Sequence, residues 1–118
     1  MLIYRVERNG IGPYFSVNIS KKLKRMNSNH SSRGSKHWRP TPTKDILRDG
    51  KPFYMGDEEF CGFSSLLDLQ DWFRGYRAEL RRSGFKISIY EGEPSGIGTQ
   101  QLVFVKSAAT LIKQINVR

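Results

Sequence analysis

The sequence predicts an α+β fold: one main amphipathic helix packed on a small, mostly antiparallel, curved sheet, with a basic mobile insert at residues 20–44. Three observations predict this class. One long apolar stripe has helical spacing, several short segments alternate as strands do, and strands and helices do not alternate repeatedly as they do in a doubly wound parallel sheet. A length of 118 residues matches a single domain, which we expect to span 1–118.

The N-terminal part is predicted to contain two strands. Residues 2–7 (LIYRVE) alternate in side-chain direction, and residues 14–19 (YFSVNI) are a second, shorter candidate. Between them, Asn9-Gly10 and Gly12-Pro13 are turn signals.

The composition shifts at Ser20. Residues 20–43 are rich in Lys, Arg, Ser, Asn and Pro and nearly free of aliphatic side chains, with Trp38 as the largest apolar group. Such a segment buries too little apolar surface to offset the entropy lost on ordering. A mobile loop is therefore predicted there.

The main helix is predicted to begin at Ser64 or Ser65 and to end before Gly84. Its apolar residues recur at steps of three and four: Leu66, Leu69, Phe73, Tyr76 and Leu80. The other predicted elements are strands at 60–63, 85–90 and 101–105, a Gly/Pro/Ser loop at 91–99 and a short helix at 107–115.

The charge is concentrated in one part of the chain. The formal net charge is +9, and nine Lys or Arg residues but no Asp or Glu lie between Arg8 and Lys44, both included. The rest of the chain holds the other 11 basic residues and all 11 acidic ones, so it is balanced. A neutral domain with one cationic segment presents a local field to an anionic partner, such as nucleic acid or an acidic protein surface.

The candidate partner-binding residues lie in this segment. The run 21–25 is a basic cluster of the kind that contacts phosphates, and 37–39 adds a Trp ring beside cations, which suits single-stranded nucleic acid. The full set is Lys21, Lys22, Lys24, Arg25, Arg33, Lys36, His37, Trp38 and Arg39. A solvated basic loop without a partner explains the same pattern.

Signals for catalysis or for a metal are weak. The two histidines and Cys61 match no zinc spacing, so no metal site is predicted, and Cys61 lies in an apolar strand as a buried, inert thiol does. Arg5 is either a solvated strand residue paired with Glu7 or an arginine on the floor of a sheet that binds a phosphate or carboxylate. One cysteine, no membrane-length apolar run and no signal peptide predict a protein of the cytoplasm.

Short motifs near both ends of the chain carry a resemblance. They are Tyr4-Arg5-Val6-Glu7, Gly10-x-Gly12-Pro13-Tyr14, the run 60–66 (FCGFSSL) with Trp72-Phe73, Gly84-Phe85 and the run 101–104 (QLVF). Together they resemble a group of small proteins of phages and prophages of enteric bacteria. The likeness leaves out the basic insert, and it implies a setting, the cytoplasm of a host cell, rather than an activity.

A second resemblance is to ADP-ribosyltransferase-like domains, which bind NAD in a cleft. Arg5 matches their first-strand position, Ser64 the strand-to-helix position, and Gln101 the region of the catalytic glutamate. The glutamine departs from the family, because a neutral amide does not stabilise a cationic ribosyl transition state as a carboxylate does. This resemblance implies an NAD enzyme that uses Arg5, Ser64 and Gln101, or an inactive descendant of one.

The leading functional prediction is a small phage or prophage accessory protein that acts without catalysis and without a cofactor. It would bind an anionic partner through residues 20–44 and so inhibit or modulate a host defence or nucleic-acid-handling complex. The alternative is the ADP-ribosyltransferase-like enzyme with NAD. The first function requires the basic insert, whereas the second requires the cleft around Arg5.

Overall fold

The computed structural model describes residues 1–48 and 50–118. In chain order the elements are β1 (Leu2–Glu7), α1 (Lys21–Ser31), α2 (Pro42–Asp45), β2 (Leu47–Arg48), β3 (Lys51–Pro52), β4 (Glu59–Gly62), α3 (Leu66–Trp72), α4 (Arg77–Arg82), β5 (Lys86–Glu91), β6 (Pro94–Ile97), β7 (Leu102–Val105), a 3₁₀ turn (Lys106–Ala108) and β8 (Thr110–Asn116). The α+β class is confirmed. No helix in the described part of the chain is long and apolar enough to cross a membrane.

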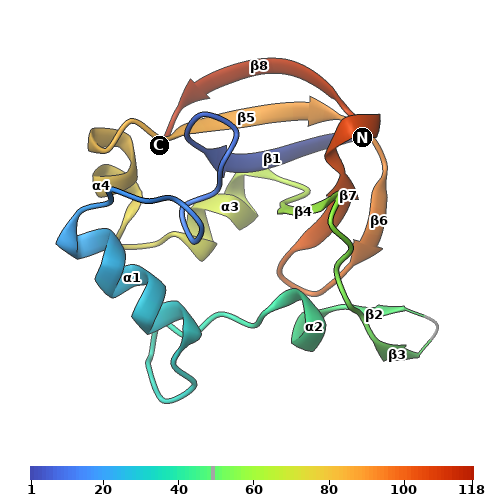
Figure 1. The fold of residues 1–118 in the computed structure, drawn as a ribbon, viewed down its shortest axis with the longest axis horizontal. Coiled ribbons are helices and arrows are strands. Elements are labelled where there is room, and N and C mark those ends of the chain that lie inside the picture. The colour runs from blue at the N-terminus through green and yellow to red at the C-terminus, as the bar shows by residue number, and fades with distance from the viewer. Residues whose placement is uncertain (49) are drawn as a thin grey trace.

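In the part of the chain that the structure describes, the strands pair antiparallel, as predicted, but they form three small sheets rather than one. Their orders are β1-β5-β8, β4-β7-β6 and β2-β3. Two backbone hydrogen bonds of 2.8 Å between Tyr4 and Phe63 join β1 to the end of β4. Figure 1 shows β8, β5 and β1 side by side along one side of the molecule, with α3 beneath β1, α4 beyond the left end of the strands and α1 below α4.

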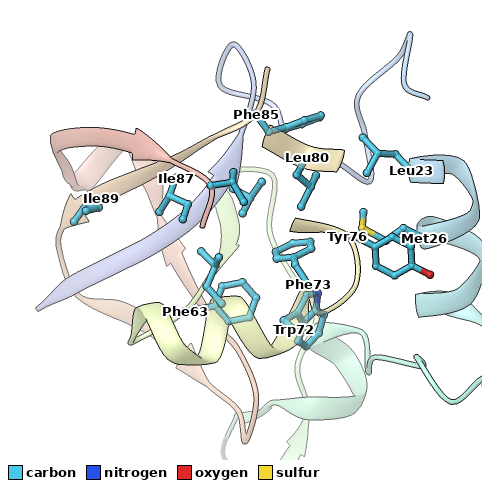
Figure 2. Packing of buried hydrophobic residues seen from close by; sticks show 13 residues of the cluster. Leu23, Met26, Phe63, Trp72, Phe73, Tyr76, Leu80, Phe85, Ile87 and Ile89 are labelled. Carbon is cyan, nitrogen blue, oxygen red and sulfur yellow. The ribbon is translucent and has the colours of Figure 1, made fainter. Parts of the chain in front are cut away.

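The largest core cluster lies between these helices and the β1-β5-β8 sheet. Phe73, Leu80 and Ile87 are at most 3% exposed within it. Figure 2 shows Leu23 and Met26 of α1 extending from the other side toward Tyr76 and Leu80. Burying side chains of this size contributes roughly 1.5–3 kcal/mol each, so α1 is part of the core and not an appendage to it.

The prediction of one main helix over 65–82 is wrong, because two short helices occupy that range. The capping end is as predicted: the Ser65 hydroxyl accepts a hydrogen bond from the backbone N–H of Asp68. The helix then stops at Trp72, and a turn containing Gly75 with φ of +87° redirects the chain into α4. Glycine adopts this left-handed conformation without the steric cost that other residues meet.

Residues 20–44 also differ from the loop predicted there, because Lys21–Ser31 form α1 and Pro42–Asp45 form α2. Ser20 caps α1 by accepting a hydrogen bond from the backbone N–H of Leu23. Leu23, Met26 and His30 recur at steps of three and four and are buried. The sequence prediction missed this helix because the apolar stripe is short and the residues around it are mostly basic and polar. The mobility of the segment in solution stays a prediction.

The C-terminal helix predicted over 107–115 is wrong. After the 3₁₀ turn, residues 110–116 form β8, which pairs with β5 along its whole length. The apolar spacing of Ala108, Leu111 and Ile112 fits a helix, but the open edge of β5 supplies hydrogen-bond partners and so decides for a strand.

Two smaller expectations also fail. Residues 14–19 contain turns instead of a strand, and Asn18 has a φ of +57° that ends any extended run. The loop predicted at 91–99 contains β6, which pairs with β7. The strands predicted at 2–7, 60–63, 85–90 and 101–105 are confirmed within a residue or two as β1, β4, β5 and β7.

Candidate functional site

Two open pockets meet at Gly75, where α1 lies against α4. One, of about 570 Å³, is lined mainly from α4 and the C-terminal residues, and the other, of about 390 Å³, is lined from α1 and Tyr76. The cations around both pockets form what we call the basic face: Lys22, Arg25, Arg77, Arg81, Arg82 and Arg118. Among the described residues, no Asp or Glu lines either pocket.

Four of the six cations of this basic face were not predicted. The sequence prediction placed the charge surplus in residues 20–44, whereas Arg77, Arg81 and Arg82 belong to α4 in a part of the chain that is neutral on average. Arg82 pairs with Glu79 at 2.8 Å. The detectable signal was the spacing of four residues between Arg77 and Arg81, which places them on neighbouring turns of a helix.

The predicted partner-binding residues divide into two groups. The exposed ones are Lys21, Lys22, Lys24, Arg25, Arg33 and Lys36. Of these, Lys22 and Arg25 line the pocket beside Tyr76, whereas Lys21 and Lys24 do not. The sequence cluster is therefore divided by the helix into cations that face the pocket and cations that face elsewhere.

The second group consists of His37, Trp38 and Arg39, and it holds residues 37–39 against the rest of the molecule. The Arg39 guanidinium donates hydrogen bonds to the backbone oxygens of Asp71 (2.9 Å) and Trp72 (3.2 Å), so it fixes the chain to the C-terminal end of α3. His37 packs edge-on against Tyr76, with ring centroids 5.9 Å apart. Trp38 is half-buried and lies beneath the Arg33 guanidinium at 5.8 Å.

A partly buried hydrogen-bond chain fixes α1 in place. The indole N–H of Trp72 donates to the Tyr14 hydroxyl oxygen at 2.7 Å, and the Tyr14 hydroxyl lies 2.6 Å from Nδ1 of His30. The Tyr14 hydroxyl accepts from the indole and can donate its own proton to Nδ1 when His30 carries its hydrogen on Nε2. Burial, with the charges of Arg39 and His37 nearby, lowers the pKa of His30 to about 4. His30 is thus a neutral structural residue on the inner side of α1.

Arg5 is one of the residues that the enzyme alternative requires. It lies in a second charged cluster, which also contains Glu7 and Lys106. Its Nε donates to Glu7 at 3.0 Å and its Nη1 to the backbone oxygen of Cys61 at 2.8 Å. Lys106 approaches the same Glu7 oxygen at 2.9 Å, and Tyr90 donates to the other. Burial alone would raise the pKa of Glu7, but hydrogen bonds from Tyr90 and Lys106 outweigh it and hold that pKa below its ordinary value.

The other two residues of the enzyme alternative do not join Arg5. Ser64 and Gln101 line a small cavity of about 70 Å³, whereas Arg5 lines a different one. Gln101 is 5% exposed, and its amide donates to the backbone oxygen of Pro40 at 2.8 Å. It therefore tethers the basic segment to β7. Ser64 donates to the Asp68 carboxylate at 3.4 Å.

Other chemistry is weakly represented. Burial raises the pKa of the Cys61 thiol to about 11, which disfavours the thiolate that a nucleophile or metal ligand needs. Within the residues that the structure describes, no group of three or more His, Cys, Asp or Glu side chains is arranged to hold a metal ion.

Comparisons with known proteins place the chain in a family. No curated protein and no solved structure matches it significantly. A family model described as the bacteriophage T4 Y00F protein matches residues 1–118. The match spans the basic segment as well as both ends, so the phage setting no longer depends on short motifs. The chain belongs to the bacteriophage T4 Y00F protein family.

Proposed function

We propose that this phage protein binds a nucleic acid through the basic face and acts without catalysis, as an accessory protein that modulates a host nucleic-acid-handling or defence complex. One observation carries the proposal. Two sequence segments about fifty residues apart, in α1 and α4, bring their cations around adjoining pockets that no described acidic side chain lines.

The free state of several of these cations supports binding to phosphates. Within the described residues, Arg25 and Arg81 form no ion pair and are exposed, whereas the exposed Lys22 interacts electrostatically with Glu79. Like charges held close together raise the local potential, and an anionic partner relieves their repulsion while releasing counterions. Arginine also matches phosphate oxygens with two parallel donors, so α4 suits a phosphate backbone better than a row of lysines would.

Aromatic rings beside the cations favour a nucleic acid over an acidic protein surface. His37 and Tyr76 line the pocket beside α1, and Trp38 follows His37 in the chain. Tyr76 is buried, but the half-buried rings of His37 and Trp38 next to cations offer stacking surfaces for unpaired bases, which an acidic protein surface does not use. We therefore infer a single-stranded segment as the first partner to test.

Fluorescence anisotropy with a labelled single-stranded oligonucleotide tests the proposal. Affinity should fall steeply with salt, with a logarithmic slope of about 0.7 for each phosphate neutralised. Arg25→Glu and Arg81→Glu should each weaken binding and reduce that slope. Lys24→Glu is the matched control. It also reverses one positive charge on α1, but Lys24 does not line either pocket.

Three results would contradict the proposal. Equal losses in Lys24→Glu and Arg25→Glu would show that only net charge matters and that there is no localised site. Binding to polyglutamate but not to the oligonucleotide would replace the nucleic acid by an acidic protein surface. Affinity that does not change with salt would exclude a phosphate contact altogether.

A further inference from the structure

A separate pocket lies where the turn of residues 10–15 faces residues 55–57, over the cluster that contains Arg5. Its volume is about 480 Å³, within the range of small-ligand sites. Most of its lining is apolar, and several of its apolar side chains are exposed: Ile11, Tyr14, Phe15 and Met55. Exposed apolar groups gathered around one cavity are typical of a binding site.

The guanidinium of Arg5 is the cation that lines this pocket. Its Nε and Nη1 donate to Glu7 and to the backbone oxygen of Cys61, and its plane lies over the Phe60 ring at 5.1 Å. No described residue accepts a hydrogen bond from Nη2. Arg5 as a whole is 9% exposed and lines the pocket, so Nη2 is the donor of this guanidinium that is left for a ligand there.

Gly12 keeps that edge open. A Cβ at this position would lie 3.1 Å from Nη2 of Arg5, closer than an ordinary van der Waals contact. The backbone of Gly12 does not have a positive φ, so an alanine is tolerated by the chain and acts only through its methyl group. The absence of a side chain here lets the turn close over Arg5 without covering Nη2.

The local charges select the ligand. Arg5 and Lys106 share the single buried carboxylate of Glu7, which leaves one surplus positive charge. Lys106 does not line the pocket, whereas Asp57 and Glu59 do, and Glu59 is engaged by the backbone N–H of Gly56 and by Ser95. Because two acids line the pocket beside one cation, the repulsion felt by a bound anion grows with its charge, so a monocarboxylate is favoured over a phosphate dianion.

We propose that this pocket binds a carboxylate attached to an apolar, aryl-sized body, with the carboxylate on Nη2 of Arg5 and the body against Phe15, Met55 and Phe60. A charge-assisted hydrogen bond in a largely apolar cavity supplies orientation, and burial of the ring supplies affinity. Two sources share this chemistry: a free aryl carboxylate, and the C-terminal residue of a peptide. The site is independent of the basic face and does not rest on its proposed function.

Amide NMR titration of the full chain tests the site, with phenylacetate as the probe. Saturable shifts should appear in residues 10–15 and 55–57, with a Kd in about the millimolar range, which is ordinary for so small a ligand. Phenylacetamide, which has the same ring and no charge, should bind at least about tenfold more weakly. N-acetylphenylalanine distinguishes the sources, because tighter binding than phenylacetate indicates a peptide C-terminus and weaker binding a free acid.

Two variants make the test decisive. Gly12→Ala should weaken phenylacetate at least about tenfold, while Gly34→Ala, which has open space around its Cβ, should not change it. Arg5→Lys keeps a cation beside Glu7 but removes the guanidinium edge, and it should lose binding as well. Equal binding of the amide, unchanged binding in Gly12→Ala, or the absence of saturable shifts with either carboxylate would overturn the proposal.

Discussion

The basic face and the Arg5 cluster contain the same residue types in opposite settings. On the basic face, Arg25 and Arg81 are exposed and lie in solvent. In the Arg5 cluster, a 9% exposed arginine shares the 2% exposed Glu7 with Lys106. A side chain's charge therefore does not by itself indicate its role, because burial decides whether that charge stabilises the fold or remains available to a partner.

The energetics of the two regions differ accordingly. Exposed ion pairs contribute roughly 0–1 kcal/mol and are screened by salt. A buried group that loses its partner costs far more, because desolvation of the remaining charge is no longer compensated. Mutations of the buried ion pairs in the Arg5 cluster should thus affect stability, whereas mutations on the basic face should affect nucleic-acid binding with little change in stability.

The largest expected effect is that of Glu7→Gln. It removes the one carboxylate that Arg5 and Lys106 share and leaves two cations together, so unfolding free energy should fall by about 3–5 kcal/mol. Urea denaturation measures this. Asp71→Asn is the control, since it breaks the exposed pair with Arg74 and should leave the urea midpoint almost unchanged. Similar midpoints for both variants would remove the distinction between the two regions.

Leu23→Ala tests whether α1 packs on the core and so positions the cations of the basic face. Leu23 is fully buried on the inner side of α1, so the truncation should cost roughly 2–5 kcal/mol. Lys24→Ala, the adjacent exposed position, should have little effect on the same urea curve. If Leu23→Ala leaves stability unchanged, α1 does not pack on the core in solution, and the pockets at Gly75 are not preformed.

The third prediction concerns pH and the hydrogen-bond chain beneath the basic face. The pKa of His30 is lowered from 6.5 to about 4. Between these two pH values, His30 binds a proton in the unfolded chain but stays neutral in the folded protein. Stability is therefore full above pH 6.5 and falls as the pH drops, by roughly 2 kcal/mol between pH 6.5 and pH 5. The lowered pKa of Glu7 also makes stability fall as the pH drops, but only at lower pH.

Thermal melts at pH 7 and pH 5 separate the histidines. His30→Gln should remove most of the slope whatever its effect at pH 7, whereas His37→Gln should retain it. A wild-type stability that does not change over this interval would mean that His30 is not buried as a neutral group.

The smallest effect concerns local mobility within residues 20–44. The predicted mobility is now expected mainly in the connection between α1 and α2, because α1 is tied down by Leu23, Met26 and His30. Limited trypsin digestion, read by mass spectrometry, should cut first after Arg33 or Lys36. First cleavage after Lys22 or Lys24 would restore a wholly mobile insert, and first cleavage within 69–82 would contradict the domain organisation.

The sequence alone determined the fold class and four of the strands, because alternation and β-branched content are local properties that pairing rarely reverses. It also determined the cap at Ser65 and the phage setting. It indicated the basic cluster at Lys22 and Arg25, since charge is visible without coordinates. These features depend on residues that lie within a few positions of each other.

The tertiary structure decided the rest. Residues 110–116 have a helical pattern but are a strand, because β5 offers an unpaired edge that is about twenty residues away in the chain. Leu23 and Met26 define a helix only because Tyr76 and Leu80 lie opposite them to receive their side chains. The basic face likewise exists only where α1 meets α4. Composition averages over the chain, whereas fields, pockets and packing depend on distance in space, and only the fold determines those distances.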